Sequence, residues 1–301
     1  MKTNDLTRRQ FIGQSAAAAG ATWLGAGGVS TAEARVKRTA TDQVTLGQTQ
    51  IKLSRLGIGT GSNSGEVQRA LGREGFNRLL RYAYDQGITY IDTAESYKTH
   101  EWIRDAIKGL PREKLFIQTK MPGLPDKPLE VLDRYRKELD TDYVDSLLMH
   151  CMVKGAWHDE QRRVMDLFEE AREKKIIRSK GVSCHSLPAL ARSARTPWVE
   201  VQLARVNPQC VWIDGPEEHW NKPGKSIDPV LAELKTMRAR GCGVIGMKMI
   251  GNGEFTQPED REKAIRFAMH CGLLDAVVIG FKSPAEIDES IERINRALAE
   301  A

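Results

Sequence analysis

Residues 115–150 read LFIQTKMPGLPDKPLEVLDRYRKELDTDYVDSLLMH, and this stretch decides the fold. Two short apolar runs, LFIQTK (115–120) and DSLLMH (145–150), flank segment 128–139, in which apolar residues recur at helical spacing. Short runs that are apolar on both faces are typical of buried parallel strands. The stretch therefore predicts a strand–helix–strand unit.

The same pattern repeats along the chain. The apolar runs are RLGIGT (55–60), TYIDTA (89–94), LFIQTK (115–120), DSLLMH (145–150), KGVSCH (180–185), VEVQLARV (199–206), GVIGMKM (243–249) and AVVIGFK (276–282). The helical segments are 75–86, 100–109, 128–139, 158–174, 188–195, 229–240, 258–271 and 284–299. Short β-rich pieces around Gly47 predict a hairpin before the first strand. Eight such pairs predict an α/β fold, a (β/α)8 TIM barrel.

A doubly wound open sheet is the alternative architecture. It usually has fewer strands, and it calls for a glycine-rich phosphate loop after the first strand. The segment GIGTGS (57–62) lacks a third glycine at the right distance. These glycines instead predict a tight turn near a ligand.

Composition narrows the function classes. The 301 residues carry a net charge of +5, with 41% hydrophobic, 28% charged and only 6% aromatic residues. This balance is typical of a soluble globular chain, and the scattered basic excess predicts no nucleic-acid partner. No apolar run is long enough for a spanning helix, so we expect no stable membrane insertion. Five widely spaced cysteines without a CxxC motif predict no metal site.

The first residues differ from the rest. A polar start with adjacent Arg8 and Arg9 leads into the Ala- and Gly-rich run FIGQSAAAAGATWLGAGGV (11–29), which is followed by Ala32-Glu33-Ala34. This order resembles the twin-arginine export signal of bacteria, with a cleavage site after small residues. An unstructured tail that contains two arginines is the alternative.

The export interpretation sets the expected boundaries. We predict a signal peptide at 1–34, a linker at 35–41 and the barrel at 42–301. It also predicts the twin-arginine export machinery as a partner and a periplasmic location. Because this pathway moves folded proteins, we expect any nucleotide to be loaded before export and to stay tightly bound.

Four polar residues lie at neighbouring strand ends, where barrel enzymes gather their function. Asp92 and Tyr97 follow the second strand, Lys120 ends the third and His150 ends the fourth. Lys120 beside Tyr97 should lower the tyrosine pKa, Asp92 should hold the lysine, and a neutral His150 should orient a carbonyl oxygen. Singly, each has a structural explanation, such as a helix cap for Asp92. Together they predict a site that protonates a carbonyl.

At these residues the chain resembles the aldo-keto reductase superfamily. The D-x-x-x-x-Y block appears as DTAESY (92–97), the T-K as QTK (118–120) and the run ending in His as DSLLMH (145–150). The resemblance covers 42–300 and implies that the hairpin plugs the barrel floor. It implies reduction of a small-molecule aldehyde or ketone with a nicotinamide cofactor and no metal. Tyr97 would be the general acid, supported by Lys120, Asp92 and His150.

The resemblance also implies cofactor contacts, and these match only in part. Cys184 stands where the family has Asn, and Met247 stands where it often has an aromatic, although Met247 also suits core packing. Glu286 disfavours a 2′-phosphate whereas Lys282 favours one, which leaves NADP(H), the family's usual cofactor, and NAD(H) both open. The predicted cofactor residues are Thr60, Gly61, Ser183, Cys184, Gln202, Met247, Lys248, Lys282, Ser283, Glu286 and Ser290.

Two aromatic segments predict the substrate side. Segment 207–228 is long for a strand–helix connection, and its Trp212 and Trp220 favour a packed lid over disorder. Trp157 follows the fourth strand on the same side. An exported nucleotide-binding redox sensor or binding module with little turnover is the alternative to an enzyme, motivated by the altered cofactor positions.

Overall fold

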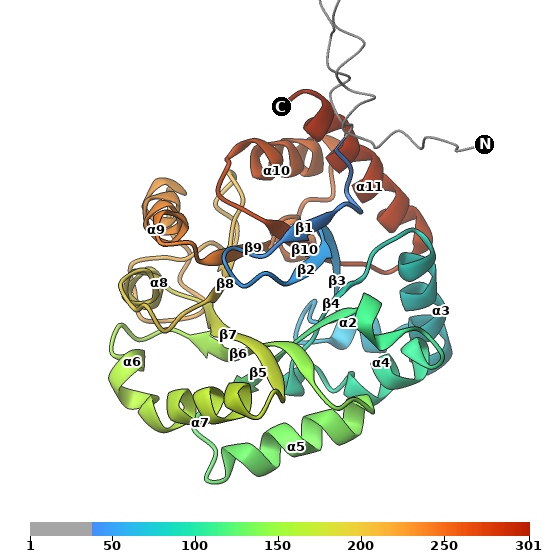
Figure 1. The fold of residues 1–301 in the computed structure, drawn as a ribbon. Coiled ribbons are helices and arrows are strands. Elements are labelled where there is room, and N and C mark those ends of the chain that lie inside the picture. The colour runs from blue at the N-terminus through green and yellow to red at the C-terminus, as the bar shows by residue number, and fades with distance from the viewer. Residues whose placement is uncertain (1–37) are drawn as a thin grey trace, which may run out of the picture. The chain divides into compact units, whose positions relative to one another are not determined.

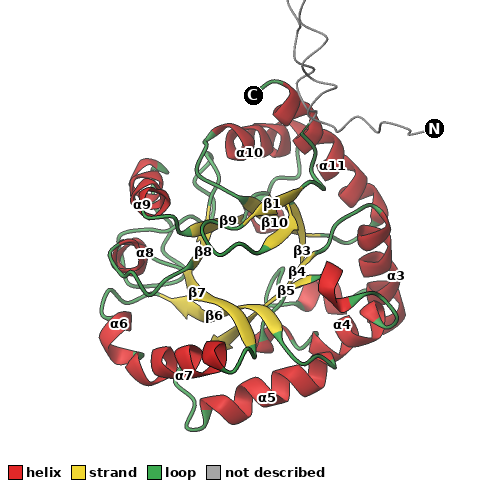
Figure 2. Ribbon diagram, in the orientation of Figure 1, coloured by secondary structure: helices red, strands yellow, loops and turns green. Residues whose placement is uncertain are grey.

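The computed structural model describes residues 38–301, and these form a closed barrel of eight parallel strands (Figures 1 and 2). The strand order around the barrel is β10-β3-β4-β5-β6-β7-β8-β9. The barrel strands are β3 (Leu56–Gly59), β4 (Tyr90–Asp92), β5 (Phe116–Pro122), β6 (Val144–Met152), β7 (Ile177–Cys184), β8 (Val201–Arg205), β9 (Gly243–Met247) and β10 (Ala276–Gly280). The predicted TIM barrel is confirmed.

Helices surround the strands (Figure 2). They are α2 (Glu66–Arg69), α3 (Gly72–Asp85), α4 (His100–Ile107), α5 (Pro128–Leu139), α6 (Trp157–Glu160), α7 (Arg162–Glu173), α8 (Leu187–Ala194), α9 (Asp228–Ala239), α10 (Pro258–His270) and α11 (Pro284–Ala299). Proline occupies one of the first positions of α5, α8, α9, α10 and α11, where the missing N–H has no intrahelical partner to lose. No helix among residues 38–301 is long and apolar enough to cross a membrane.

The hairpin of β1 (Gln43–Thr45) and β2 (Lys52–Ser54) covers the N-terminal end of the barrel (Figure 1). Leu46, Ile51 and Leu53 are buried in one cluster with residues of the barrel interior, such as Tyr90 and Phe116. Each such burial contributes about 1.5–3 kcal/mol. The hairpin therefore plugs the floor, and the opposite end, where the strands finish, stays available for chemistry.

The predicted boundaries need two corrections. The helix predicted at 158–174 is two helices, α6 and α7, because Gln161 takes a non-helical conformation with φ −103°. The predicted linker at 35–41 is part of the fold from residue 38 onward. Ala40 is fully buried and its N–H donates to Asn295 on α11 at 2.7 Å. The predicted signal peptide, residues 1–34, lies outside the described residues.

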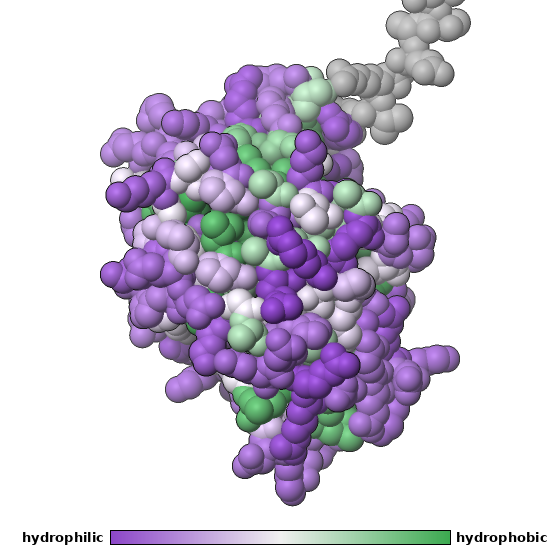
Figure 3. Space-filling view, turned by 90° about the vertical axis from the view of Figure 1, so that its left-hand side faces the viewer, coloured by the Kyte–Doolittle hydropathy of each residue, from purple (hydrophilic) through white to green (hydrophobic). Residues whose placement is uncertain are grey.

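A second cluster of buried apolar side chains lies between the strands and the helices and includes residues of α3 to α11. The molecular face over α6, α8 and α9 is mainly hydrophilic, with small separate hydrophobic patches (Figure 3). Most apolar side chains are therefore buried inside the barrel or between its strands and helices. Polar side chains lie at the C-terminal ends of the strands.

Candidate active site

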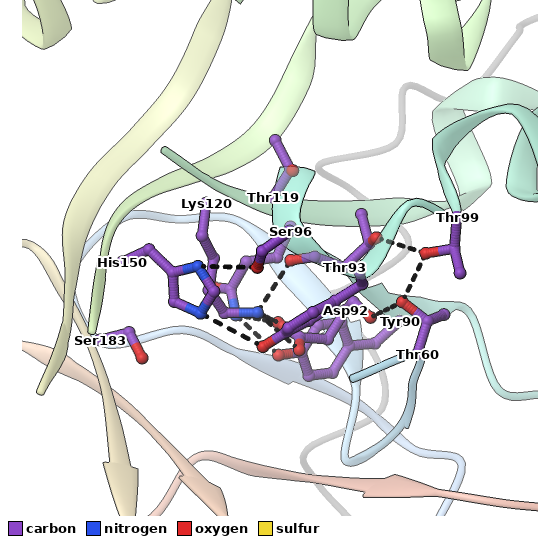
Figure 4. A network of polar contacts seen from close by, with 12 residues as sticks. Thr60, Tyr90, Asp92, Thr93, Ser96, Thr99, Thr119, Lys120, His150 and Ser183 are labelled. Atoms are coloured by element: carbon purple, nitrogen blue, oxygen red, sulfur yellow. Dashed lines mark hydrogen bonds and ion pairs between the residues drawn. The ribbon is translucent and has the colours of Figure 1, made fainter. Parts of the chain in front are cut away.

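Three neighbouring strands bring the predicted catalytic residues together. Asp92 ends β4, Lys120 lies in β5 and His150 lies in β6 (Figure 4). The Lys120 ammonium is 2.9 and 2.8 Å from the two carboxylate oxygens of Asp92 and also donates to the Thr93 carbonyl at 2.8 Å. Lys120 is only 1% exposed and Asp92 5%. Such a buried pair holds the ammonium in one place.

Tyr97 reaches the same point from the short 3-10 helix after β4, Glu95–Tyr97. Its hydroxyl oxygen lies 3.4 Å from His150 Nε2, and the Lys120 ammonium lies 5.0 Å from the centre of its ring. A Cβ at Gly61 would come within 2.8 Å of the Tyr97 hydroxyl oxygen. The glycine therefore allows the phenol to lie against the turn after β3.

The short helix that carries Tyr97 is also held by residues outside the barrel strands. Glu95, two residues earlier, accepts a hydrogen bond from the Tyr135 hydroxyl on α5 at 2.6 Å. The Arg69 guanidinium donates to the Tyr97 carbonyl at 2.5 Å. Both contacts fix the short helix that carries the phenol.

The protonation states differ in part from expectation. Burial, together with the Asp92 charge, raises the pKa of Tyr97 well above 10, so the expected lowering by Lys120 is wrong for this site. The physical reason is that the Asp92 carboxylate neutralises Lys120 and is itself close to the phenol. Burial also lowers the Lys120 pKa, against the effect of Asp92. Burial and nearby cations lower the His150 pKa to about 3, so the imidazole is neutral, as predicted.

Some predicted cofactor residues near the strand ends contact other residues of the mouth, and others are buried in the packing of the barrel. Thr60 is buried after β3 and its hydroxyl is 3.1 Å from the Asp92 carbonyl. Ser183 lies in β7 (Figure 4). Its hydroxyl is 3.4 Å from His185 Nε2. Cys184 instead belongs to the outer cluster, where its sulfur is 3.3 Å from the Ser193 hydroxyl on α8. Gln202 is fully buried in β8.

Two further predicted residues end β9. Met247 packs in the inner cluster, which favours the core-packing explanation. Lys248 donates from its ammonium to Asn252 Oδ1 at 2.7 Å, a neutral partner. Burial and the charges of Arg205 and Lys120 lower the Lys248 pKa to about 8. Within the described part of the chain, residues 38–301, this ammonium forms no ion pair with a carboxylate, which suits a phosphate or carboxylate ligand.

The remaining residues predicted to bind the cofactor lie at the start of α11. The Ser283 hydroxyl caps the helix by accepting from the Glu286 N–H. The Glu286 carboxylate accepts from the Lys282 N–H at 2.7 Å and lies 3.6 Å from the Lys282 ammonium. Ser290 is buried one turn further on. A carboxylate of the chain thus already uses the donors that a 2′-phosphate would use.

Of the three predicted substrate residues, one is buried in the core and two lie at the mouth. Trp157 is 1% exposed, and its indole N–H donates to the Ala189 carbonyl at 3.1 Å, so it presents no surface to a ligand. Trp212 and Trp220 remain at the mouth, with their rings parallel within 3° and their centres 6.2 Å apart.

Sequence reasoning missed a buried ion pair at this end of the barrel. Arg205 Nε lies 2.6 Å from Asp214 Oδ1, and both side chains are at most 1% exposed. Burial raises the Asp214 pKa to about 6 against the effect of Arg205. The available signal was an arginine inside an apolar strand, because a buried charge requires a partner.

The donor set fits a nicotinamide dinucleotide. The Ser183 hydroxyl suits a carboxamide, and the Lys248 ammonium, whose hydrogen-bond partner among residues 38–301 is the Asn252 amide, suits a pyrophosphate. The Glu286 carboxylate suits a ribose hydroxyl better than a phosphate.

Comparison with known proteins gives the family. The sequence profile of the Aldo/keto reductase family matches residues 55–270. The chain belongs to the aldo/keto reductase family. An aldo-keto reductase of Glycine max is 28% identical over 229 residues, which cover 70% of this chain and 60% of the relative. The methylglyoxal reductase DkgA of Salmonella typhimurium is 27% identical over 227 residues, 70% of this chain and 76% of the relative.

Solved structures of the family share the fold. An aldo-keto reductase from Bacillus halodurans in its holo form has a TM-score of 0.67 at 15% identity, covering 87% of this chain and 96% of that one. The chain spans 60% or less of the length of the first curated relatives that it matches.

Proposed function

We propose that this aldo/keto reductase is an NAD(P)H-dependent oxidoreductase that reduces aldehydes or ketones, with Tyr97 as general acid. The observation that carries the proposal is the convergence of Tyr97, His150 and the Asp92–Lys120 pair at one point of the mouth. A bound reduced nicotinamide would supply a hydride to the carbonyl carbon.

The chain's own residues supply the proton and the orientation. With its raised pKa, Tyr97 holds its proton at neutral pH and has it available for the carbonyl oxygen. In the tautomer that carries its proton on Nε2, the neutral His150 imidazole donates beside the Tyr97 oxygen, and its Nδ1 accepts from the Ser96 hydroxyl 3.4 Å away. Both groups therefore donate toward one oxygen. The Lys120 ammonium stabilises the phenolate that forms as the proton leaves.

Ser183 and Lys248 would hold the nicotinamide and pyrophosphate parts, and the start of α11 would receive the adenosine. The family's usage favours NADP(H), whereas the Glu286 contacts with Lys282 favour NAD(H). We therefore propose a nicotinamide dinucleotide and treat the 2′-phosphate as the property that a Glu286 variant tests.

The test is Tyr97→Phe in the purified protein, assayed with a panel of aldehydes, ketones and quinones. We expect kcat to fall by about 10²- to 10⁴-fold because the general acid is lost, with nucleotide binding unchanged. The matched control is Tyr84→Phe on α3, which should keep full activity. Full activity in the Tyr97 variant would contradict the role of the phenol. Nucleotide binding without turnover of any carbonyl would support a nucleotide-binding sensor instead.

We also propose export through the twin-arginine pathway to the periplasm, on the strength of Arg8, Arg9 and Ala32-Glu33-Ala34. Replacing both arginines with lysine should retain the uncleaved protein in the cytoplasm, whereas the unchanged chain should be recovered from the periplasm with its nucleotide bound. Fractionation followed by mass spectrometry measures both. Identical distributions of the two proteins would contradict export by this route.

A further inference from the structure

The segment between β8 and α9 connects three other loops at the mouth. The Glu218 carboxylate accepts from the Gly155 N–H, after β6, at 2.7 Å. The Gly215 carbonyl accepts from the Leu187 N–H, after β7, at 2.7 Å. The Asn207 amide donates to the Lys248 carbonyl, after β9, at 3.1 Å. These contacts hold the segment against the mouth as a packed wall.

Arg205 connects this wall to the loop that lies beside His150. Besides its pair with Asp214, its guanidinium donates to the Trp220 carbonyl at 2.9 Å and to the His185 carbonyl. The His185 ring centre lies 6.4 Å from that of His150. One buried guanidinium therefore connects the strand end, the loop that faces His150 and the backbone of Trp220.

The conformation of Trp212 and the exposure of Trp220 both lower the stability of the folded protein. Trp220 is 50% exposed, one of two large apolar side chains this exposed among residues 38–301. Trp212 has φ 58°, in the left-handed region that a bulky side chain rarely adopts, and its indole N–H donates to the Glu254 carboxylate. A strained backbone and an exposed aromatic ring both cost free energy, and such costs cluster at ligand sites.

We propose that Trp212 and Trp220 form a stacking platform for the flat apolar ring of an aromatic carbonyl substrate, with Arg205 as the residue that positions the platform. This inference rests on the proposed function and names its substrate class. Parallel rings give a further flat ring a stacking partner, and stacking removes exposed indole surface from water. A small aliphatic carbonyl uses the same reacting groups but gains nothing from the platform.

The experiment compares 4-nitrobenzaldehyde with propionaldehyde in Trp220→Ala. We expect KM for the aromatic aldehyde to rise about three- to tenfold, the range of an aromatic stacking contact, with kcat little changed and propionaldehyde unaffected. The matched control is Leu124→Ala, which removes the other exposed apolar side chain of the described residues. An equal rise in the control, or an equal rise for propionaldehyde, would overturn the inference.

Two further measurements separate positioning from folding and from turnover. Arg205→Lys keeps the charge but loses the forked contacts of a buried pair, so the thermal midpoint should fall. Well below that midpoint, KM for 4-nitrobenzaldehyde should rise while the propionaldehyde kinetics stay close to those of the unchanged protein. Calorimetric binding of 4-nitrobenzyl alcohol should weaken by the same factor in Trp220→Ala. Unchanged alcohol binding overturns the platform, whereas a failure to reduce any carbonyl counts against the proposed function alone.

Discussion

Two buried ion pairs stand at the mouth of the barrel, and they differ in how fully their carboxylates are partnered. Asp92 accepts from Lys120 with both oxygens and from the Gln118 amide at 2.8 Å. Asp214 accepts from Arg205 with one oxygen, and within residues 38–301 its other oxygen has no hydrogen-bond partner. The first pair joins neighbouring strands, and the second joins a strand to a loop. Full partnering keeps a charge in place for chemistry, whereas partial partnering leaves a charge that protonation can remove.

The largest effect is expected from breaking the first pair. Asp92→Asn leaves the Lys120 ammonium buried without a counter-charge, so the free energy of unfolding should fall by about 3–5 kcal/mol. Activity should fall with it, because Lys120 is no longer fixed beside Tyr97. Urea denaturation and steady-state kinetics measure the two losses.

The control for this loss is an exposed pair. Lys127 and Glu130 are 71% and 68% exposed, and Glu130→Gln should leave stability and activity unchanged. A loss for Asp92→Asn no larger than for this control would show that the buried pair stabilises nothing.

A smaller effect with a pH signature is expected from the second pair. Asp214→Asn should cost about 1.5–3 kcal/mol at pH 7, the range for a lost hydrogen bond to a charged group, because Arg205 keeps its contacts with the Trp220 and His185 carbonyls. The folded protein protonates Asp214 with a pKa of about 6, whereas the unfolded chain does so near 3.8. As pH falls from 7 to 5, the unchanged protein should therefore gain about 1 kcal/mol over the variant.

The measurement is urea denaturation of both proteins at the two pH values. Asp166→Asn, in an exposed pair on α7, serves as the control and should follow the unchanged protein at both. A stability difference for Asp214→Asn that is the same at pH 7 and pH 5 would mean that the partially partnered carboxylate does not titrate in this range.

The smallest effect on stability and the clearest on selectivity is expected at an exposed pair. Glu286→Gln removes the negative charge beside the Lys282 ammonium, so affinity for NADPH relative to NADH should rise about threefold or more. Fluorescence titration with each nucleotide measures the ratio without turnover. Glu292→Gln, further along α11, is the control. An unchanged ratio would show that the start of α11 does not receive the adenosine.

Much of the fold follows from short-range patterns. The buried strands are continuous apolar runs, and α5 has the predicted bounds because Pro128 and the apolar spacing mark it. The break between α6 and α7 was not predictable, since Gln161 has no sequence signal of a helix end. Ala40 was predicted as linker because a single small residue gives no sign of the contact it makes with α11, which is far along the chain.

The cluster of residues proposed to be catalytic was predictable for a geometric reason. Strand ends of a parallel barrel meet at one mouth, so Asp92, Lys120 and His150 had to be neighbours. The Arg205–Asp214 pair was not, because Asp214 lies in a loop whose path depends on the contacts it makes. The raised pKa of Tyr97 also required the structure, since it depends on the burial of the phenol and on how close the Asp92 charge lies to it.

The hairpin that closes the N-terminal end of the barrel restricts how ligands can enter and leave. Because Leu46, Ile51 and Leu53 fill the N-terminal end, every molecule that reaches Tyr97 must enter and leave through the same opening. If a nucleotide and a substrate both bind there, as proposed, they share this opening and cannot exchange independently. The one that lies deeper would then arrive first and depart last, so the proposed reaction would have an ordered sequence of binding and release.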